Sequence, residues 1–209
     1  MLLREKLVQT ELAAAKLGIR EVGADNHGPW VKKFLAEVGL PEGYAWCDAF
    51  QSFEMAGAAG HKLPIESASV VQTYDTAAKL GWVVIKPARA DLVCYDFDGD
   101  GRFDDHIGLV VRVVSIGPVL TLETVEGNTS SGEAGSQANG DGVFLRRRVI
   151  SANKVAFVRI PGEVPGPIEN VVDPEARGES KRDAPFVAPT APASLAAPEP
   201  TSEHGRGAH

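Results

Sequence analysis

The sequence predicts an α+β domain, in which helices come first along the chain and an antiparallel sheet follows. Up to Gly81, apolar residues recur at the spacing of amphipathic helices. Beyond it, short runs rich in β-branched residues are separated by clusters of glycine, proline, asparagine and aspartate. Helices and strands segregated in this way favour a sheet packed against a helical layer.

Four helices are expected in the first part of the chain. The second is the best marked, because Pro29 suits a first helical turn and Gly39 suits the end. The third is expected to begin near Cys47 and to run to the glycines at 57 and 60. Together the four helices cover about residues 2–17, 29–39, 47–60 and 67–80.

Six short runs in the second part of the chain are expected to be strands. The third and fourth flank Gly117 and Pro118, a pair that suits a turn, so we expect these two strands to form a hairpin. The six runs cover residues 82–85, 91–97, 107–116, 119–125, 142–149 and 155–160.

The composition of the chain changes after residue 162. Residues 163–209 hold eight of the 14 prolines, together with alanine, serine and glutamate, and show no sustained apolar period. Such a segment cannot bury enough apolar surface to offset the entropy lost on ordering. We therefore predict a folded domain over residues 1–162 and a disordered Pro/Ala/Glu-rich tail over residues 163–209.

Charge and apolar content exclude several classes of protein. The net charge of −7 argues against a nucleic-acid partner, and the apolar runs are too short for membrane insertion. The segment 1–6 carries charges where a secretory signal needs its apolar stretch, so we expect synthesis in the cytoplasm without an export signal. Two cysteines are too few for a disulfide scaffold and do not fit a zinc site.

Cys47 is the candidate nucleophile. A thiol on the first turn of a helix meets free backbone N–H groups and the positive end of the helix dipole, and we expect both to lower its pKa. The N–H of Cys47 itself is also a candidate donor to a developing oxyanion. The alternative is a small buried core residue, which is how we interpret Cys94, in the second strand.

His106 is the candidate base. It immediately precedes the apolar run that begins at Ile107, so its imidazole is expected at the start of a strand. The other histidines lie in turn-rich stretches or in the tail. The alternative interpretation is a loop histidine beside acidic residues.

Glu126 and Asn128 are the candidates for a third catalytic group. They lie at the end of the fourth strand, which the predicted hairpin returns to the side of His106. Either side chain could accept a hydrogen bond from the imidazole and fix its tautomer. The alternative is an ordinary strand end with a Gly-Asn turn.

Taken in order, these motifs resemble the CHAP family of papain-like cysteine, histidine-dependent amidohydrolases and peptidases. The resemblance covers about residues 15–160. Asp48, Gln51 and Ala90 depart from residues that are more common in the family at these places. The motifs that carry the resemblance are Trp46-Cys47, Asp105-His106-Ile107-Gly108 and Glu126-Gly127-Asn128-Thr129.

The resemblance implies that residues 1–162 are a CHAP catalytic domain with a papain-like fold, which hydrolyses an amide bond in bacterial peptidoglycan. In this sequence Cys47 would attack the carbonyl, and His106 would take and then return the proton. Glu126 would orient the imidazole with help from Asn128. The acidic side chain of Asp48 would oppose ionisation of the neighbouring thiol.

The acidic loop from Asp96 to Asp105 is similar to a calcium-binding loop of the EF-hand kind. Acids at relative positions 1, 3 and 5 are followed by glycine at position 6, a carbonyl at position 7 and an acid at position 9. Ile107 stands where the usual glutamate of position 12 would be. We expect Ca²⁺, with a solvated turn as the alternative, and the predicted ligands are Asp96, Asp98, Asp100, the Arg102 carbonyl and Asp104.

Three functions therefore follow as hypotheses. The first is a monomeric peptidoglycan hydrolase, either an N-acetylmuramoyl-L-alanine amidase or a peptide endopeptidase. It would act as a phage endolysin released by a holin-like route or as a virion-associated lysin. The second is a calcium-dependent wall-binding or structural module with a degenerate active site. The third is a papain-like hydrolase of small amide substrates such as glutathione conjugates.

Overall fold

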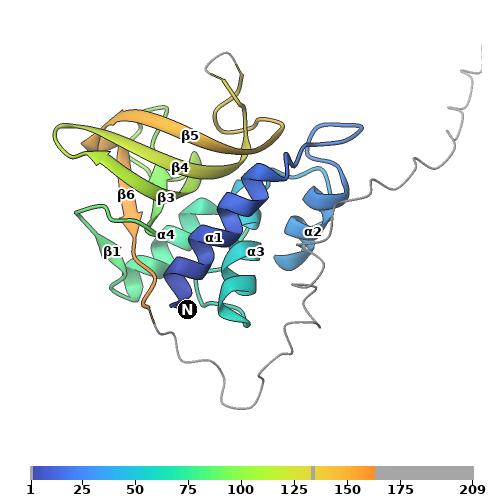
Figure 1. Cartoon of the computed structure of the whole chain (residues 1–209), viewed down its shortest axis with the longest axis horizontal. Helices are drawn as coiled ribbons and strands as arrows, with labels where there is room; N and C mark the ends of the chain where they lie inside the picture. Colours follow the sequence, from blue (N-terminus) through green and yellow to red (C-terminus); the bar gives the residue numbers. More distant parts are fainter. Residues whose placement is uncertain (1, 133–134, 163–209) are drawn as a thin grey trace, which may run out of the picture.

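The computed structural model describes residues 2–132 and 135–162, and in this part helices precede strands as predicted (Figure 1). The helices are α1 (Leu3–Lys16), α2 (Pro29–Glu37), α3 (Cys47–Ala59) and α4 (Val70–Lys79), and a short 3-10 helix covers Ala152–Lys154. The strands are β1 (Val83–Val84), β2 (Leu92–Tyr95), β3 (His106–Ser115), β4 (Val119–Thr129), β5 (Gly142–Ser151) and β6 (Val155–Val158). The predicted α+β class is confirmed. The predicted tail, residues 163–209, lies outside the described residues.

The strands form one six-stranded sheet in the order β1-β6-β2-β3-β4-β5, and every neighbouring pair is antiparallel. Strands β3 and β4 make the predicted hairpin about Gly117 and Pro118. The hairpin places the start of β3 next to the end of β4. The first residue of β3 and the last residues of β4 therefore lie at the same end of the sheet.

The helices cover one face of this sheet. Helices α1 and α3 lie side by side against strands β3 to β5, and α2 packs on α3 (Figure 1). Alternation along β2 assigns the two faces, because Leu92 and Cys94 join the main core with the helices. Val93 and Tyr95 join a second, smaller apolar cluster on the other face.

Aromatic side chains fix α2 on the start of α3. Phe34 is fully buried and stacks on the ring of Trp46, with 5.6 Å between centroids. It also makes edge contacts with Phe50 and Phe53, with 5.2 Å between centroids in each pair. The residue just before Cys47 is thus held by packing as well as by the helix.

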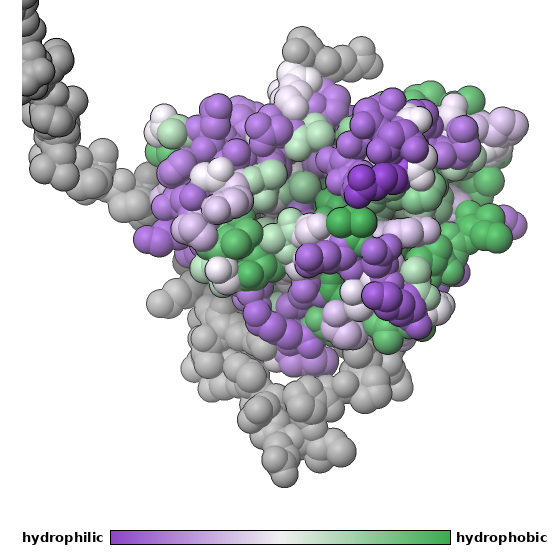
Figure 2. All heavy atoms as spheres, turned by 180° about the vertical axis from the view of Figure 1, so that it is seen from behind, coloured by the Kyte–Doolittle hydropathy of each residue, from purple (hydrophilic) through white to green (hydrophobic). Residues whose placement is uncertain are grey.

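The surface has no extended apolar face in the view from behind, where polar side chains predominate and apolar ones form separate groups (Figure 2). Exposed large apolar residues include Ile85 and Val149. Exposed apolar side chains of this kind are ordinary on a folded protein. None of the helices in the described part of the chain is both long and apolar enough to cross a membrane.

Replacing Phe34 with alanine should lower the free energy of unfolding by about 3–5 kcal/mol, because it removes a fully buried ring and leaves a cavity. Urea denaturation measures the loss. Val149→Ala is the control, since this side chain is 68% exposed and should change stability by less than about 0.5 kcal/mol. Equal effects of the two substitutions would contradict the packing described here.

Candidate active site

Cys47 is the first residue of α3, and its side chain is almost completely buried. The backbone N–H groups of Cys47 and Asp48 favour the thiolate and lower the thiol pKa. Burial has the larger, opposite effect, and with the Asp48 carboxyl it raises the pKa of Cys47 to about 12. The expected lowering of the thiol pKa is therefore wrong. Forming the thiolate requires a proton acceptor close to the sulfur.

The end of β4 fixes the start of α3. Gly127 lies against the rings of Trp46 and Phe50, and a Cβ at this position would be 2.8 Å from both. The Asn128 amide fits the orientation in which its oxygen accepts from the backbone N–H of Trp46 at 3.0 Å. Its nitrogen then donates to the Gly140 carbonyl at 2.8 Å. Asn128 thus holds the residue before Cys47 rather than the imidazole.

His106 is the first residue of β3, and its ring contacts Glu126 on β4. The distance between His106 Nε2 and Glu126 Oε2 is 3.1 Å, and both side chains are fully buried. Gly108 makes the contact possible, because a Cβ there would lie 2.5 Å from the Glu126 side chain. Of the two predicted orienting residues, Glu126 is the one in contact with the ring.

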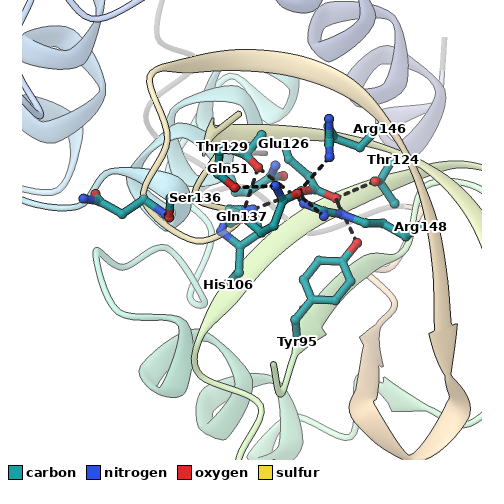
Figure 3. Close-up of polar contacts among 12 residues, drawn as sticks. Gln51, Tyr95, His106, Thr124, Glu126, Thr129, Ser136, Gln137, Arg146 and Arg148 are labelled. Carbon is teal, nitrogen blue, oxygen red and sulfur yellow. Dashed lines mark hydrogen bonds and ion pairs between the residues drawn. The ribbon is translucent and has the colours of Figure 1, made fainter. Parts of the chain in front are cut away.

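Glu126 accepts hydrogen bonds from three further side chains (Figure 3). Its Oε1 accepts from Tyr95 at 3.0 Å and from Thr124 at 2.6 Å. Arg148 donates to both oxygens, with 2.9 Å between Nε and Oε1. Arg148 also lies over the rings of Tyr95 and Phe97.

These contacts keep Glu126 ionised. Burial alone would raise its pKa, but the hydrogen bonds and charge of Arg148 and the bond from His106 outweigh burial and hold the pKa well below the usual range. A carboxyl whose pKa is lower in the folded than in the unfolded chain stabilises the fold above its unfolded pKa, about 4.3. This stabilisation is lost as the pH falls from there toward the folded pKa.

An ionised Glu126 also sets the tautomer of His106. A carboxylate only accepts, so Nε2 must carry the ring proton, and Nδ1 of the neutral ring then has a free lone pair. Nδ1 is buried and has no hydrogen-bond partner among the described residues. The rings of Tyr95 and Phe97 stack near the imidazole and hold its plane. His106 therefore has a fixed ring with one unoccupied basic nitrogen.

Cys47 belongs to the same region as this pair. The charge of Glu126 contributes to the raised pKa of the Cys47 thiol, so the two groups are within electrostatic reach. The neighbours of Glu126 along β4, Gly127 and Asn128, contact Trp46 directly. The structure therefore brings His106 and Glu126 into contact, holds Asn128 against Trp46, and puts Cys47 within electrostatic reach of Glu126.

The acidic loop after β2 brings together a different set of carboxylates from the one predicted. One oxygen each of Asp96, Asp98 and Asp105 lie within 4.8 Å of one another, a spacing that suits an oxygen-binding cation such as Ca²⁺ or Mg²⁺. Asp104 instead forms an ion pair with Arg102, at 2.7 Å.

Two other groups define the surroundings of this carboxylate set. Asp100 accepts from the backbone N–H of Arg102 at 2.8 Å. The Lys154 ammonium lies 3.7 Å from Asp96 Oδ1, so the loop already has one positive charge beside it.

Three residues of the site were not predicted from the sequence, namely Tyr95, Thr124 and Arg148. The one signal for Arg148 was the run of three arginines at 146–148 inside a β-rich segment. Period-two alternation puts two of them on one face of the strand. Both Arg146 and Arg148 are indeed buried.

No protein-family model matches the chain, and no curated protein or solved structure matches it either. The chemistry of the site therefore follows from its own geometry.

Replacing Arg148 with methionine should lower the free energy of unfolding by about 3–5 kcal/mol at neutral pH, because it leaves the buried Glu126 carboxylate without its cation. Urea denaturation at pH 7 measures the change. Adding Glu126→Gln to Arg148→Met should recover part of the loss, since the uncompensated charge is then gone. A single Arg148→Met variant as stable as the native protein would contradict the ion pair.

Proposed function

We propose that the protein is a cysteine hydrolase that cleaves amide bonds, with Cys47 as nucleophile, His106 as base and Glu126 as the residue that orients the base. The observation that carries the proposal is the His106 ring, whose Nε2 is bonded to an ionised carboxylate while Nδ1 is buried without a partner. A histidine held in this way is suited to take a proton from a nearby nucleophile.

In the proposed reaction, His106 Nδ1 takes the thiol proton as the Cys47 sulfur attacks the substrate carbonyl. The backbone N–H of Cys47, at the start of α3, would donate to the oxyanion that forms. The tetrahedral intermediate collapses to a thioester when His106 returns the proton to the leaving amine. Water then hydrolyses the thioester with His106 as base, which releases the acid and restores the thiol.

The raised pKa of Cys47 defines when the proton moves. A thiol with a pKa of about 12 stays protonated in the resting protein at neutral pH. Proton transfer to His106 therefore accompanies the attack on the carbonyl. The ionised Glu126 stabilises the imidazolium at that moment, as an acidic third residue does in other triads.

Peptidoglycan is the substrate in this proposal, and the fold is papain-like. Both rest on the resemblance of the sequence motifs to CHAP hydrolases, and a helix that carries cysteine at its start and packs on an antiparallel sheet agrees with them. The cleaved bond is that of an N-acetylmuramoyl-L-alanine amidase or of a peptide endopeptidase. Release by a holin-like route or from a virion would bring such an enzyme to the wall.

The proposal includes a bound calcium ion in the acidic loop. Asp96, Asp98 and Asp105 would hold the ion, which would offset their charge and fix the loop that leads into His106. The raised thiol pKa and this carboxylate set also favour a second function, a calcium-dependent wall-binding module without catalysis. Activity of the native protein distinguishes the two.

Replacing Cys47 with alanine should reduce the release of peptide fragments from purified cell walls by at least about a thousandfold, since no nucleophile remains. Mass spectrometry of the muropeptides measures the release and identifies the cleaved bond. Cys94→Ala is the matched control, because this thiol is buried in β2 and should affect stability instead. Lysis by the Cys47→Ala variant at the native rate would overturn the proposal, and binding to walls without cleavage by the native protein would favour the second function.

Replacing Asp105 with asparagine should weaken calcium binding more than tenfold, because one of three clustered carboxylates loses its charge. Isothermal titration of chelator-treated protein with calcium measures the affinity. Asp104→Asn is the matched control, since this neighbouring carboxylate is paired with Arg102 and should leave the affinity nearly unchanged. The absence of binding at millimolar calcium in the native protein would reduce the loop to a solvated turn.

A further inference from the structure

Asp48, the residue after the proposed nucleophile, is buried in an unusual environment. Its side chain is fully buried on α3, and it forms a hydrogen bond with the Thr73 hydroxyl on α4. Its Oδ1 has no hydrogen-bond partner in the described part of the chain, and no lysine, arginine or histidine there forms an ion pair with it. An isolated buried carboxylate is costly, and such a group takes up a proton instead.

Two other buried acids of the described residues are paired with cations. Asp91 is equally buried, but it forms ion pairs with Arg4 and Arg159, both at 2.7 Å. Glu126 is paired with Arg148. The surroundings of Asp48 differ from those of Asp91 and Glu126 in having no positive charge.

The hydrogen bonds of Thr73 indicate whether Asp48 is protonated or ionised. The Thr73 hydroxyl lies 2.6 Å from Asp48 Oδ2 and 2.9 Å from the Ile65 carbonyl oxygen. A hydroxyl has one proton, and sharing it between two acceptors weakens both hydrogen bonds. Both contacts are full hydrogen bonds when Asp48 carries a proton, which it donates to Thr73 while Thr73 donates to Ile65.

We propose that Asp48 is a positioning residue of the site, held as a neutral carboxylic acid that donates to Thr73 and thereby leaves an uncharged neighbour beside the Cys47 thiol. The effect on catalysis rests on the proposed function, whereas the protonation of Asp48 does not. Burial raises the pKa of Asp48 to about 7, which agrees with the donor count.

The charge state of Asp48 affects the pKa of two neighbouring thiols. Cys47 on its own helix and Cys94 on β2 both have a pKa that the Asp48 charge raises. Thr73 on α4 does not titrate, and Glu126 on β4 acts on Cys47 in the same direction as an ionised Asp48. Alkaline pH by itself favours the Cys47 thiolate. Above pH 7, however, Asp48 would ionise, and its negative charge would oppose formation of that thiolate.

The sign of the stability effect follows from the raised pKa. The contribution of neutral Asp48 is fully present below the unfolded pKa, about 3.9. It is lost as the pH rises from there through about 7, because the unfolded chain releases its proton first.

The test compares full-length native protein with Asp48→Asn, a neutral isostere whose amide donates to Thr73 as the acid does. Between pH 5 and pH 8 the native melting temperature should fall relative to that of Asp48→Asn by roughly 5–10 °C. Iodoacetamide should label Cys47 roughly tenfold faster in Asp48→Asn at pH 8.5, which corresponds to about one unit in the thiol pKa. Peptide mass spectrometry separates Cys47 from Cys94.

The matched control is Asp75→Asn, which removes an exposed carboxylate from α4 and should leave both pH profiles as in the native protein. A parallel pH dependence of melting in the native and Asp48→Asn proteins would overturn the proposal. If Asp48→Asn does not fold, the ¹³C chemical shift of the Asp48 carboxyl group is followed against pH in the native protein. A titration midpoint near pH 7 is expected, and a midpoint below about pH 5 would contradict the proposal. None of these readouts uses a substrate, so failure of the proposed function in the Cys47→Ala experiment is a separate result.

Discussion

The buried carboxylate of Glu126 is the group on which the described site depends. Tyr95 on β2, His106 on β3, Thr124 on β4 and Arg148 on β5 all donate to it, so one side chain joins four neighbouring strands. An acid in this position without a cation would become protonated and would stop accepting from the imidazole. Arg148 prevents this, and in doing so it also specifies the tautomer of His106.

Three buried acids show how the surroundings decide the charge of the same functional group. Asp91 and Glu126 are each paired with arginine, and they serve as fixed negative charges that hold distant segments together. Asp48 has hydroxyl and thiol neighbours instead of cations. An acid without a cation next to the thiol keeps that end of α3 free of a second negative charge, provided that the acid holds its proton.

The sequence was sufficient to predict the order of helices and strands, because amphipathic spacing and turn residues are local signals. It also predicted that Glu126 or Asn128 would lie next to His106, since a hairpin about Gly117 and Pro118 brings those ends together. Arg148 was not predicted, because its contact depends on the pairing of β4 with β5, which no short motif defines. The contact of Asn128 with Trp46 is non-local for the same reason.

The resting site contains little net charge, so the charges of the proposed reaction would form only during the reaction itself. Glu126 is neutralised by Arg148, the Cys47 thiol is protonated at neutral pH, and the imidazole has a free Nδ1. In the proposed reaction, charge separates only when the sulfur attacks a carbonyl. Each new charge then has a partner in place, since the imidazolium faces Glu126 and the oxyanion faces the N–H groups at the start of α3. A buried site can therefore accommodate a thiol of high pKa, because the substrate supplies the atom on which the negative charge finally rests.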